Sequence, residues 1–258
     1  MEYNIIKKNA YRYITIPELT ELGLKHAFTT MDMDIGMTTN KDIEEIKKNI
    51  KEVYELLGIQ PKLLYNGYQT HSSNIAIVEN LGQGLESPLG RYFPNTDGLV
   101  TNRDDVALIT RFADCVPILL FDKVKRVQAN IHSGWKGTLK EVTSSAITVL
   151  KKTFNSNPKN IIAIIGPAIG KYDFEVETDV ASQFKDKFKS WEGTIRKKNN
   201  IKYLIDLQEI NKRILLDNGI TLENITVIDL STYKDKEILH SYRRDGKEFG
   251  LMGLISSL

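Results

Sequence analysis

The stretch VALITRFADCVPILLFDKVKRVQANIHSGWKGTL, residues 106–139, decides the fold of this chain. Residues 106–110 and 116–121 are short apolar runs typical of buried strands, and residues 126–132 alternate like a third strand. The only cysteine, Cys115, lies where two of these strands meet, and His132 ends the third. A thiol and an imidazole at neighbouring strand ends can converge on one point, where scaffolds that mix helices and strands often build their sites.

The rest of the chain alternates predicted strands with amphipathic helices. The clearest helix covers residues 41–57, with Asn40 as its N-cap and Gly58 at its end. Other helices are predicted at 139–154, 177–188 and 207–218, and other strands at 11–16, 25–29, 63–68, 74–78, 161–165, 225–230 and 238–242. Residues 82–94, rich in Gly and Pro, are predicted to form a loop. Because short strand-to-strand links accompany helical crossovers, the pattern predicts an α/β or α+β fold with mixed sheets.

Composition excludes several classes of protein. The chain has 258 residues, 41% of them hydrophobic and 26% charged, which is typical of one soluble globular protein. A net charge of +2 gives no electrostatic case for nucleic acid as a partner. No apolar run reaches the length of a membrane span, and the N-terminus lacks a signal-peptide core. Because one cysteine cannot form an internal disulfide, we expect a cytoplasmic protein without a membrane partner.

The chain has few side chains that bind transition metals: Cys115 and the four histidines His26, His71, His132 and His240. One Cys with two His gives three ligands and leaves a fourth position for water, the pattern of a catalytic zinc site. His71, Cys115 and His132 each follow a strand-like run. The alternative is that Cys115 is a small buried apolar residue, because the three residues are 44 and 17 positions apart and form no short-range motif.

Three other features each have a structural and a functional interpretation. Asp114 could form a turn, or accept a hydrogen bond from a ligand imidazole. The pair Arg243 and Arg244 could be a solvated charge pair or an anion clamp. The glycines around Trp135 could allow a tight turn, or let N–H groups at a helix start face an anion, with the charge of Lys136 nearby.

Six motifs occur together and in order, and together they resemble one family. They are Gln69-Thr70-His71; Asp97-Gly98-Leu99-Val100-Thr101; Ala113-Asp114-Cys115-Val116-Pro117; His132-Ser133-Gly134-Trp135-Lys136-Gly137-Thr138; Gly166-Pro167-Ala168-Ile169-Gly170 with Phe174-Glu175-Val176; and Ser241-Tyr242-Arg243-Arg244-Asp245-Gly246. The chain resembles the YfiH-like family, also called the laccase-domain or multicopper polyphenol oxidase family, over about residues 20–255. The resemblance implies that residues 1–258 form a single catalytic domain. Its mixed sheets would be layered α/β/β/α, similar to a cytotoxic necrotising factor catalytic domain.

The resemblance also implies a site and an activity. The implied metal ligands are His71, Cys115 and His132, for zinc or alternatively copper. The implied catalytic residues are Cys115, His132 and Asp114, and the predicted substrate contacts are Gly134, Lys136, Glu175, Tyr242 and Arg244. The implied reactions are phosphorolysis of adenosine, inosine, guanosine and methylthioadenosine, and deamination of adenosine, with nucleoside and phosphate as partners. Older family labels are phenol oxidase and peptidoglycan-editing factor.

The chain departs from the family pattern at three positions. Met31 and Leu251 stand where the family often has arginine, and Ser231 stands where it often has a second cysteine. Because arginine is the side chain best suited to phosphate, the two missing arginines predict weak phosphorolysis.

We therefore expect a zinc enzyme that acts on purine nucleosides. Zinc lowers the pKa of a water bound to it, and such a water could attack C6 of adenine. The candidate proton carriers for that reaction are Asp97, Asp114 and Glu175. Phosphorolysis instead requires a phosphate held against the anomeric carbon.

Other functions stay open at this point. The sequence argues against one of them, a true multicopper oxidase, because that enzyme needs several histidines beyond the site and only His26 and His240 remain. A metal-free cysteine hydrolase would use Cys115 as nucleophile and His132 as its base. A non-catalytic partner-binding protein would show no turnover and no dependence on metal.

Overall fold

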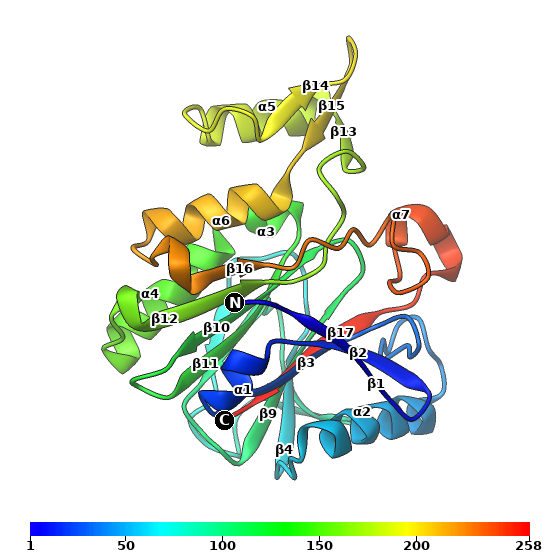
Figure 1. Ribbon diagram of the computed structural model, residues 1–258, viewed down its shortest axis with the longest axis vertical. Coiled ribbons are helices and arrows are strands. Elements are labelled where there is room, and N and C mark those ends of the chain that lie inside the picture. The colour runs from blue at the N-terminus through cyan, green and yellow to red at the C-terminus, as the bar shows by residue number, and fades with distance from the viewer.

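Two mixed sheets lie face to face at the centre of the molecule, which a computed structural model describes over residues 1–258 (Figure 1). The larger sheet has eight strands, in the order β1 (Asn4–Lys8), β2 (Tyr11–Thr15), β3 (Lys25–Thr29), β17 (Met252–Ser257), β9 (Val106–Phe112), β4 (Leu63–Gly67), β7 (Gly90–Phe93) and β6 (Leu85–Ser87). The second sheet has six strands, in the order β16 (Ile225–Val227), β12 (Ile161–Ile165), β10 (Val116–Asp122), β11 (Val127–Ser133), β8 (Gly98–Thr101) and β5 (Ile75–Ile77). Parallel and antiparallel pairs occur in both sheets, as predicted.

Helices cover the outer faces of the two sheets. The eight-stranded sheet packs against α2 (Ile43–Leu57), and the six-stranded sheet packs against α4 (Val142–Phe154) and α6 (Leu207–Asp217). The remaining helices are α1 (Pro17–Glu21), α3 (Trp135–Leu139), α5 (Thr178–Lys187) and α7 (Tyr242–Asp245), with 3-10 turns at Pro158–Asn160, Leu222–Asn224 and Gly246–Glu248. The result is the predicted α/β/β/α layering, with a core between the sheets that includes Phe28, Leu119 and Leu254.

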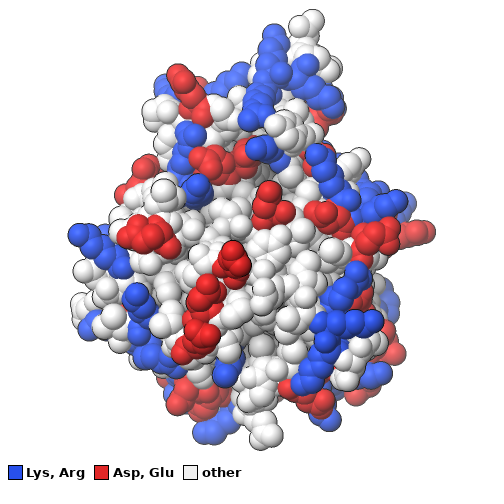
Figure 2. Space-filling model, in the orientation of Figure 1, with Lys and Arg blue, Asp and Glu red and all other residues white.

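A third, smaller sheet projects from the end of the molecule drawn at the top of Figure 1. It contains β13 (Glu175–Glu177), β15 (Lys202–Ile205) and β14 (Ile195–Lys197), and α5 packs against it. Charged side chains of both signs are interspersed over the visible face, with Lys and Arg gathered near this small sheet (Figure 2). None of the helices combines the length and the apolar character that crossing a membrane requires.

The deciding stretch connects the two large sheets. Strand β9 belongs to the eight-stranded sheet, whereas β10 and β11 form an antiparallel pair in the six-stranded sheet. All residues of these three strands are buried. Burial on both faces is typical of the largely apolar sequences of β9 and β10, whereas β11 alternates apolar residues with buried polar ones such as Gln128 and Asn130. Cys115 therefore lies in the short crossing from one sheet to the other.

Some predicted elements were wrong. Residues 82–94, predicted as loop, contain β6 and β7, an edge hairpin that turns at Pro88 and Leu89 and continues at Gly90, whose φ is 130°. Residues 238–242, predicted as a strand, form a turn in which the N–H groups of Ile238 and Leu239 donate to the carbonyl of Asp235. Helix α2 is capped by Asp42, not Asn40, because the Asp42 carboxylate accepts from the N–H groups of residues 44 and 45.

Candidate functional site

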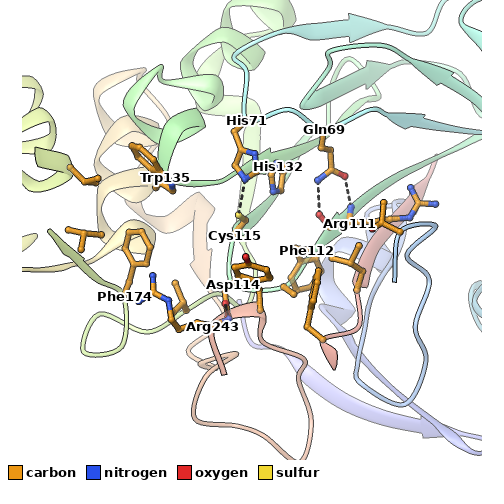
Figure 3. A pocket seen from close by; sticks show the side chains of 18 of the residues that line it. Gln69, His71, Arg111, Phe112, Asp114, Cys115, His132, Trp135, Phe174 and Arg243 are labelled. Atoms are coloured by element: carbon orange, nitrogen blue, oxygen red, sulfur yellow. Dashed lines mark hydrogen bonds between the residues drawn. The ribbon is translucent and has the colours of Figure 1, made fainter. Parts of the chain in front are cut away.

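Three of the predicted site residues meet at one point. His71 follows β4, Cys115 lies between β9 and β10, and His132 belongs to β11. Their ligand atoms all lie within 4.8 Å of one another, and Cys115 Sγ lies 3.7 Å from His71 Nε2. Figure 3 shows the two imidazoles and the thiol pointing toward each other. The structure thus holds the Cys/His₂ cluster that the sequence predicted.

Asp97 fixes the orientation of this cluster from behind. Its carboxylate is 2.9 Å from His132 Nδ1, so Nε2 of that ring is the atom left to face the cluster. The same carboxylate accepts from the N–H groups of Thr70, His71 and Ser72 at 3.1, 3.0 and 2.6 Å, and from the Ser72 hydroxyl at 2.6 Å. These bonds hold the loop in which His71 adopts a left-handed φ of 59°. Asp97 therefore positions both imidazoles and does not itself line the pocket.

The electrostatics of the cluster favour a thiolate beside a charged imidazole. Burial raises the pKa of the Cys115 thiol, but the charge of His132 and hydrogen bonds from His132 and His71 outweigh burial and lower this pKa to about 6. Burial lowers the pKa of His132, but the Cys115 charge and the Asp97 hydrogen bond raise it to about 9. Burial also raises the pKa of Asp97, yet bonds from His132 and Ser72 bring it well below its ordinary value. A thiolate is the form of cysteine that binds a metal or attacks an electrophile.

Gly134 is required beside the cluster because there is no room for a side chain. A Cβ at this position would lie 2.4 Å from His71 Cδ2 and 2.9 Å from Cys115 Sγ. Its backbone φ is −70°, so any residue could adopt the conformation, and only space excludes a larger one. This close approach explains the glycine after His132-Ser133 without any contact to substrate.

The cluster opens into a pocket of about 1060 Å³, within the range of small-molecule sites. The wall is largely apolar and aromatic, and includes Phe112, Trp135, Ile169, Phe174, Tyr242, Phe249 and Leu251. Tyr242 and Phe249 pack edge to face with ring centroids 5.0 Å apart, and 60% of Tyr242 is exposed. The small sheet contributes Glu175, Val176, Glu177 and Lys202 to the rim.

Two of the five predicted substrate contacts, Glu175 and Tyr242, line this pocket, and three do not. Gly134 lies behind the cluster, and Nζ of Lys136 lies 5.3 Å from the centre of the Trp135 ring, outside the lining. Arg244 is also outside: its guanidinium donates to the carbonyls of Thr232, Tyr233 and Leu239 and to Asp245. Ser241 caps α7, so residues 243 and 244 are successive helical positions about 100° apart, and Arg243 faces the pocket instead.

Asp114 lines the pocket, but its carboxylate already has partners. One oxygen accepts from the Thr232 hydroxyl at 2.6 Å, and the other accepts from the N–H of Arg243 at 2.7 Å. It accepts no bond from His71 or His132, so of the two interpretations of Asp114 the structure favours the turn residue over the contact with a ligand imidazole. The backbone of Asp114 has a φ of 83°, a left-handed conformation that L-residues rarely adopt. Asp114, the residue before Cys115, therefore holds the start of α7 beside the cluster.

Two pocket residues, Arg111 and Gln69, were assigned no role from the sequence, although Gln69 belongs to one of the six family motifs. Arg111 is 9% exposed, its Nε donates to the Ile35 carbonyl at 2.7 Å, and its Nη2 has no partner. Burial lowers the pKa of Arg111 to about 10. Gln69 bonds both the N–H and the carbonyl of Arg111 and so ties the His71 loop to β9. The sequence did offer one signal for Arg111, which is the only charged residue in the mainly apolar run 106–112.

The layered sheets place this chain among the mixed α/β proteins, and the Cys/His₂ cluster in its pocket gives it a candidate metal site. The chain belongs to the family described as multi-copper polyphenol oxidoreductase laccase, whose model matches residues 23–257. This match confirms the predicted family.

Similar proteins carry one recurrent name. A purine nucleoside phosphorylase of Clostridium acetobutylicum is 32% identical over 261 residues, covering 96% of this chain and 97% of the relative. The purine nucleoside phosphorylase YlmD of Bacillus subtilis is 28% identical, covering 85% of this chain and 80% of the relative. The crystal structure of the hypothetical protein YfiH of Bacillus licheniformis superimposes with a TM-score of 0.87 at 26% identity, covering 97% of each chain. These likenesses confirm the predicted fold and associate the family with nucleoside phosphorolysis.

Proposed function

We propose that residues 1–258 act as one catalytic unit, a metal-dependent purine nucleoside phosphorylase. The observation that carries the proposal is the Cys/His₂ cluster in an aromatic-walled pocket of about 1060 Å³. The names of the relatives support the same reaction. Inosine, guanosine, adenosine and methylthioadenosine are the proposed nucleosides, with inorganic phosphate as the second substrate.

His71, Cys115 and His132 would hold the metal. Two imidazoles and a thiolate within 4.8 Å of one another suit zinc, and Asp97 supplies the hydrogen bond that such a histidine ligand needs. When bound, zinc supplies a Lewis acid at the base of the pocket. Copper would also accept this donor set. The coupled copper cluster of an oxidase needs further histidines, but no other group of metal-binding side chains lies in the structure.

The chain's own side chains would bind and orient the nucleoside. The rings of Phe174, Tyr242 and Phe249 offer apolar faces to a purine base and exclude water from it. From the predicted substrate contacts we retain Tyr242 and Glu175, which line the pocket, and leave out the three that do not. The Glu175 carboxylate is bonded by Lys198 and Lys202 at 2.5 and 2.8 Å, and these bonds lower its pKa to about 2. Glu175 would therefore accept hydrogen bonds from a ribose while it remains charged.

Phosphorolysis is favoured over adenosine deamination by the state of the carboxylates. Deamination needs a group that carries protons in the pocket. Asp97 lies behind His132, Asp114 bonds Thr232 and Arg243, and Glu175 is paired with two lysines. Because all three candidates are engaged, we propose deamination only as a minor reaction of the same pocket.

A metal-free cysteine hydrolase is the second candidate, and one observation favours it. Asp97, His132 and Cys115 form a carboxylate–imidazole–thiol series with a thiol pKa of about 6, the arrangement that activates a nucleophilic cysteine. A metal bound by Cys115 would block this chemistry, so the two candidates exclude each other in one molecule.

The experiment that tests the proposal is incubation of the purified protein with inosine, with and without inorganic phosphate. Phosphorolysis predicts hypoxanthine and ribose 1-phosphate in equal amounts, and no cleavage without phosphate. The variant His132→Ala is the matched inactive control. Cleavage to free ribose that is independent of phosphate would contradict the proposal, and so would conversion of adenosine to inosine as the main reaction.

A further inference from the structure

The cations around the pocket differ in how far their charge is already used. Nζ of Lys202 lies 2.8 Å from Oε1 of Glu175, so its charge is paired. The charge of Arg244 is paired with Asp245, and its other N–H groups donate to main-chain carbonyls. Arg111 is buried in the wall, and its unpartnered Nη2 is sealed from solvent. Among the three cations that line the pocket, Arg111, Lys202 and Arg243, only Arg243 combines an exposed side chain with the absence of any carboxylate within ion-pair distance. Its charge is therefore available to a ligand.

The guanidinium of Arg243 is held in place by neutral contacts. Its Nη1 donates to the main-chain carbonyl of Glu175 at 3.0 Å, and its Cζ lies 5.5 Å from the centre of the Phe174 ring. Its main-chain N–H donates to Asp114 at 2.7 Å, at the start of a helix turn capped by Ser241. These contacts fix the side chain without neutralising it, so little rotamer entropy is lost when an anion binds. A carbonyl and a ring leave the remaining guanidinium N–H groups unpaired.

Arg243 is also linked to the candidate metal ligands through a single residue, Asp114. Asp114, which bonds its N–H, is the chain neighbour of Cys115. In Figure 3, Arg243 lies beside Phe174 on the side of the pocket next to Asp114 and Cys115, whereas Arg111 lies beyond Gln69. An anion on Arg243 would share the pocket with a nucleoside near the cluster. Leu251, which also lines this pocket, brings no charge to it.

We propose that Arg243 binds the phosphate co-substrate and holds it for attack on the anomeric carbon, an inference that rests on the proposed function. A phosphate oxygen forms the new bond to the anomeric carbon as the bond from this carbon to the purine nitrogen breaks. The electron pair of that bond goes to the purine, which takes up the proton that the hydrogen phosphate loses, and the products are the free base and ribose 1-phosphate. The planar fork of arginine matches two phosphate oxygens, which a lysine cannot reproduce.

The test compares Arg243→Gln and Arg243→Lys with the wild type and with Arg196→Gln, an exposed arginine of β14 outside the pocket. Titration calorimetry with inorganic phosphate measures binding directly, and inosine cleavage measures the KM for phosphate. Arg243→Gln should weaken phosphate binding by about tenfold to 100-fold, because a hydrogen bond to a charged group contributes about that much to the affinity. The phosphate affinity of Arg243→Lys should lie between those of the wild type and Arg243→Gln, and the affinity of Arg196→Gln should equal that of the wild type. Zinc content and the melting temperature should be unchanged in all four proteins.

Two outcomes separate this inference from the proposed function. Equal phosphate affinity in the wild type and both Arg243 variants would overturn the role of Arg243, even if phosphorolysis occurs. Phosphate binding that depends on Arg243 in a protein that cleaves no purine nucleoside would support the anion site and contradict the proposed function. If Arg243→Gln fails to fold, Arg243→Lys gives the same comparison with the charge kept and the fork removed.

Discussion

Two buried histidines of this protein have opposite environments. His26, on β3 in the larger sheet, is fully buried, and its ring meets only main-chain groups: Nε2 accepts from the Ile16 N–H at 3.0 Å, and Nδ1 lies 3.1 Å from the Leu24 carbonyl. His132, on β11, is 4% exposed, but its ring meets the Asp97 carboxylate and the Cys115 thiol. Burial lowers the pKa of His26 to about 4, whereas that of His132 rises to about 9.

The difference shows that burial alone does not decide the charge of an imidazole. Desolvation disfavours the charged form in both places, and it decides the outcome at His26 because no charge compensates. At His132 two acidic partners reverse the result. Titratable groups with strong specific partners in a pocket mark candidate sites, while a buried histidine bonded to main chain stabilises the fold. The same sheets thus contain one structural histidine and one that belongs to a reactive cluster.

The largest effect is expected at His26 as the pH falls. The pKa of His26 is about 4 in the folded chain and about 6.5 when unfolded. At a pH between these values, His26 is protonated in the unfolded chain but stays neutral in the folded chain. The free energy of unfolding should therefore decrease by about 3 kcal/mol from this residue as the pH falls from about 6.5 to about 4.

The variant His26→Gln keeps an acceptor for the Ile16 N–H but does not titrate. Denaturant unfolding at pH 7 and pH 4 should show a drop in stability about 3 kcal/mol smaller in this variant than in the wild type. Equal drops in the two proteins would show that His26 is not held neutral by burial.

A smaller effect is expected when the partner of His132 is changed. Asp97→Asn removes the charge that orients this imidazole and the loop of His71, so zinc affinity should fall about tenfold to 100-fold. The matched control is Asp122→Asn. Asp122 is fully buried at the far end of β10 and also accepts from main-chain N–H groups, those of Val124 and Lys125. Competition with a chromogenic chelator measures both affinities, and an equal affinity in the two variants would remove Asp97 from the metal site.

The sequence was sufficient for the parts that depend on pattern. Apolar runs predicted the buried strands around Cys115, and strand ends predicted that His71, Cys115 and His132 would converge. It was insufficient where side-chain direction decides. Nothing in Arg243-Arg244 tells which guanidinium faces the pocket, because the Ser241 cap sets the phase of a helix only one turn long. The roles of Asp97 and Asp114 depend on partners 25 to 129 residues away, which no local pattern encodes.

The central claim is that His71, Cys115 and His132 hold one zinc ion, and metal analysis of the wild type beside Cys115→Ser tests it most directly. Serine keeps the size of the side chain but is a poor zinc ligand, so the fold should persist while the metal is lost. We predict one zinc per chain in the wild type and loss of most of it in the variant, with the far-ultraviolet circular dichroism unchanged. The same zinc content in both proteins would contradict the account, because Cys115 would then not be a ligand.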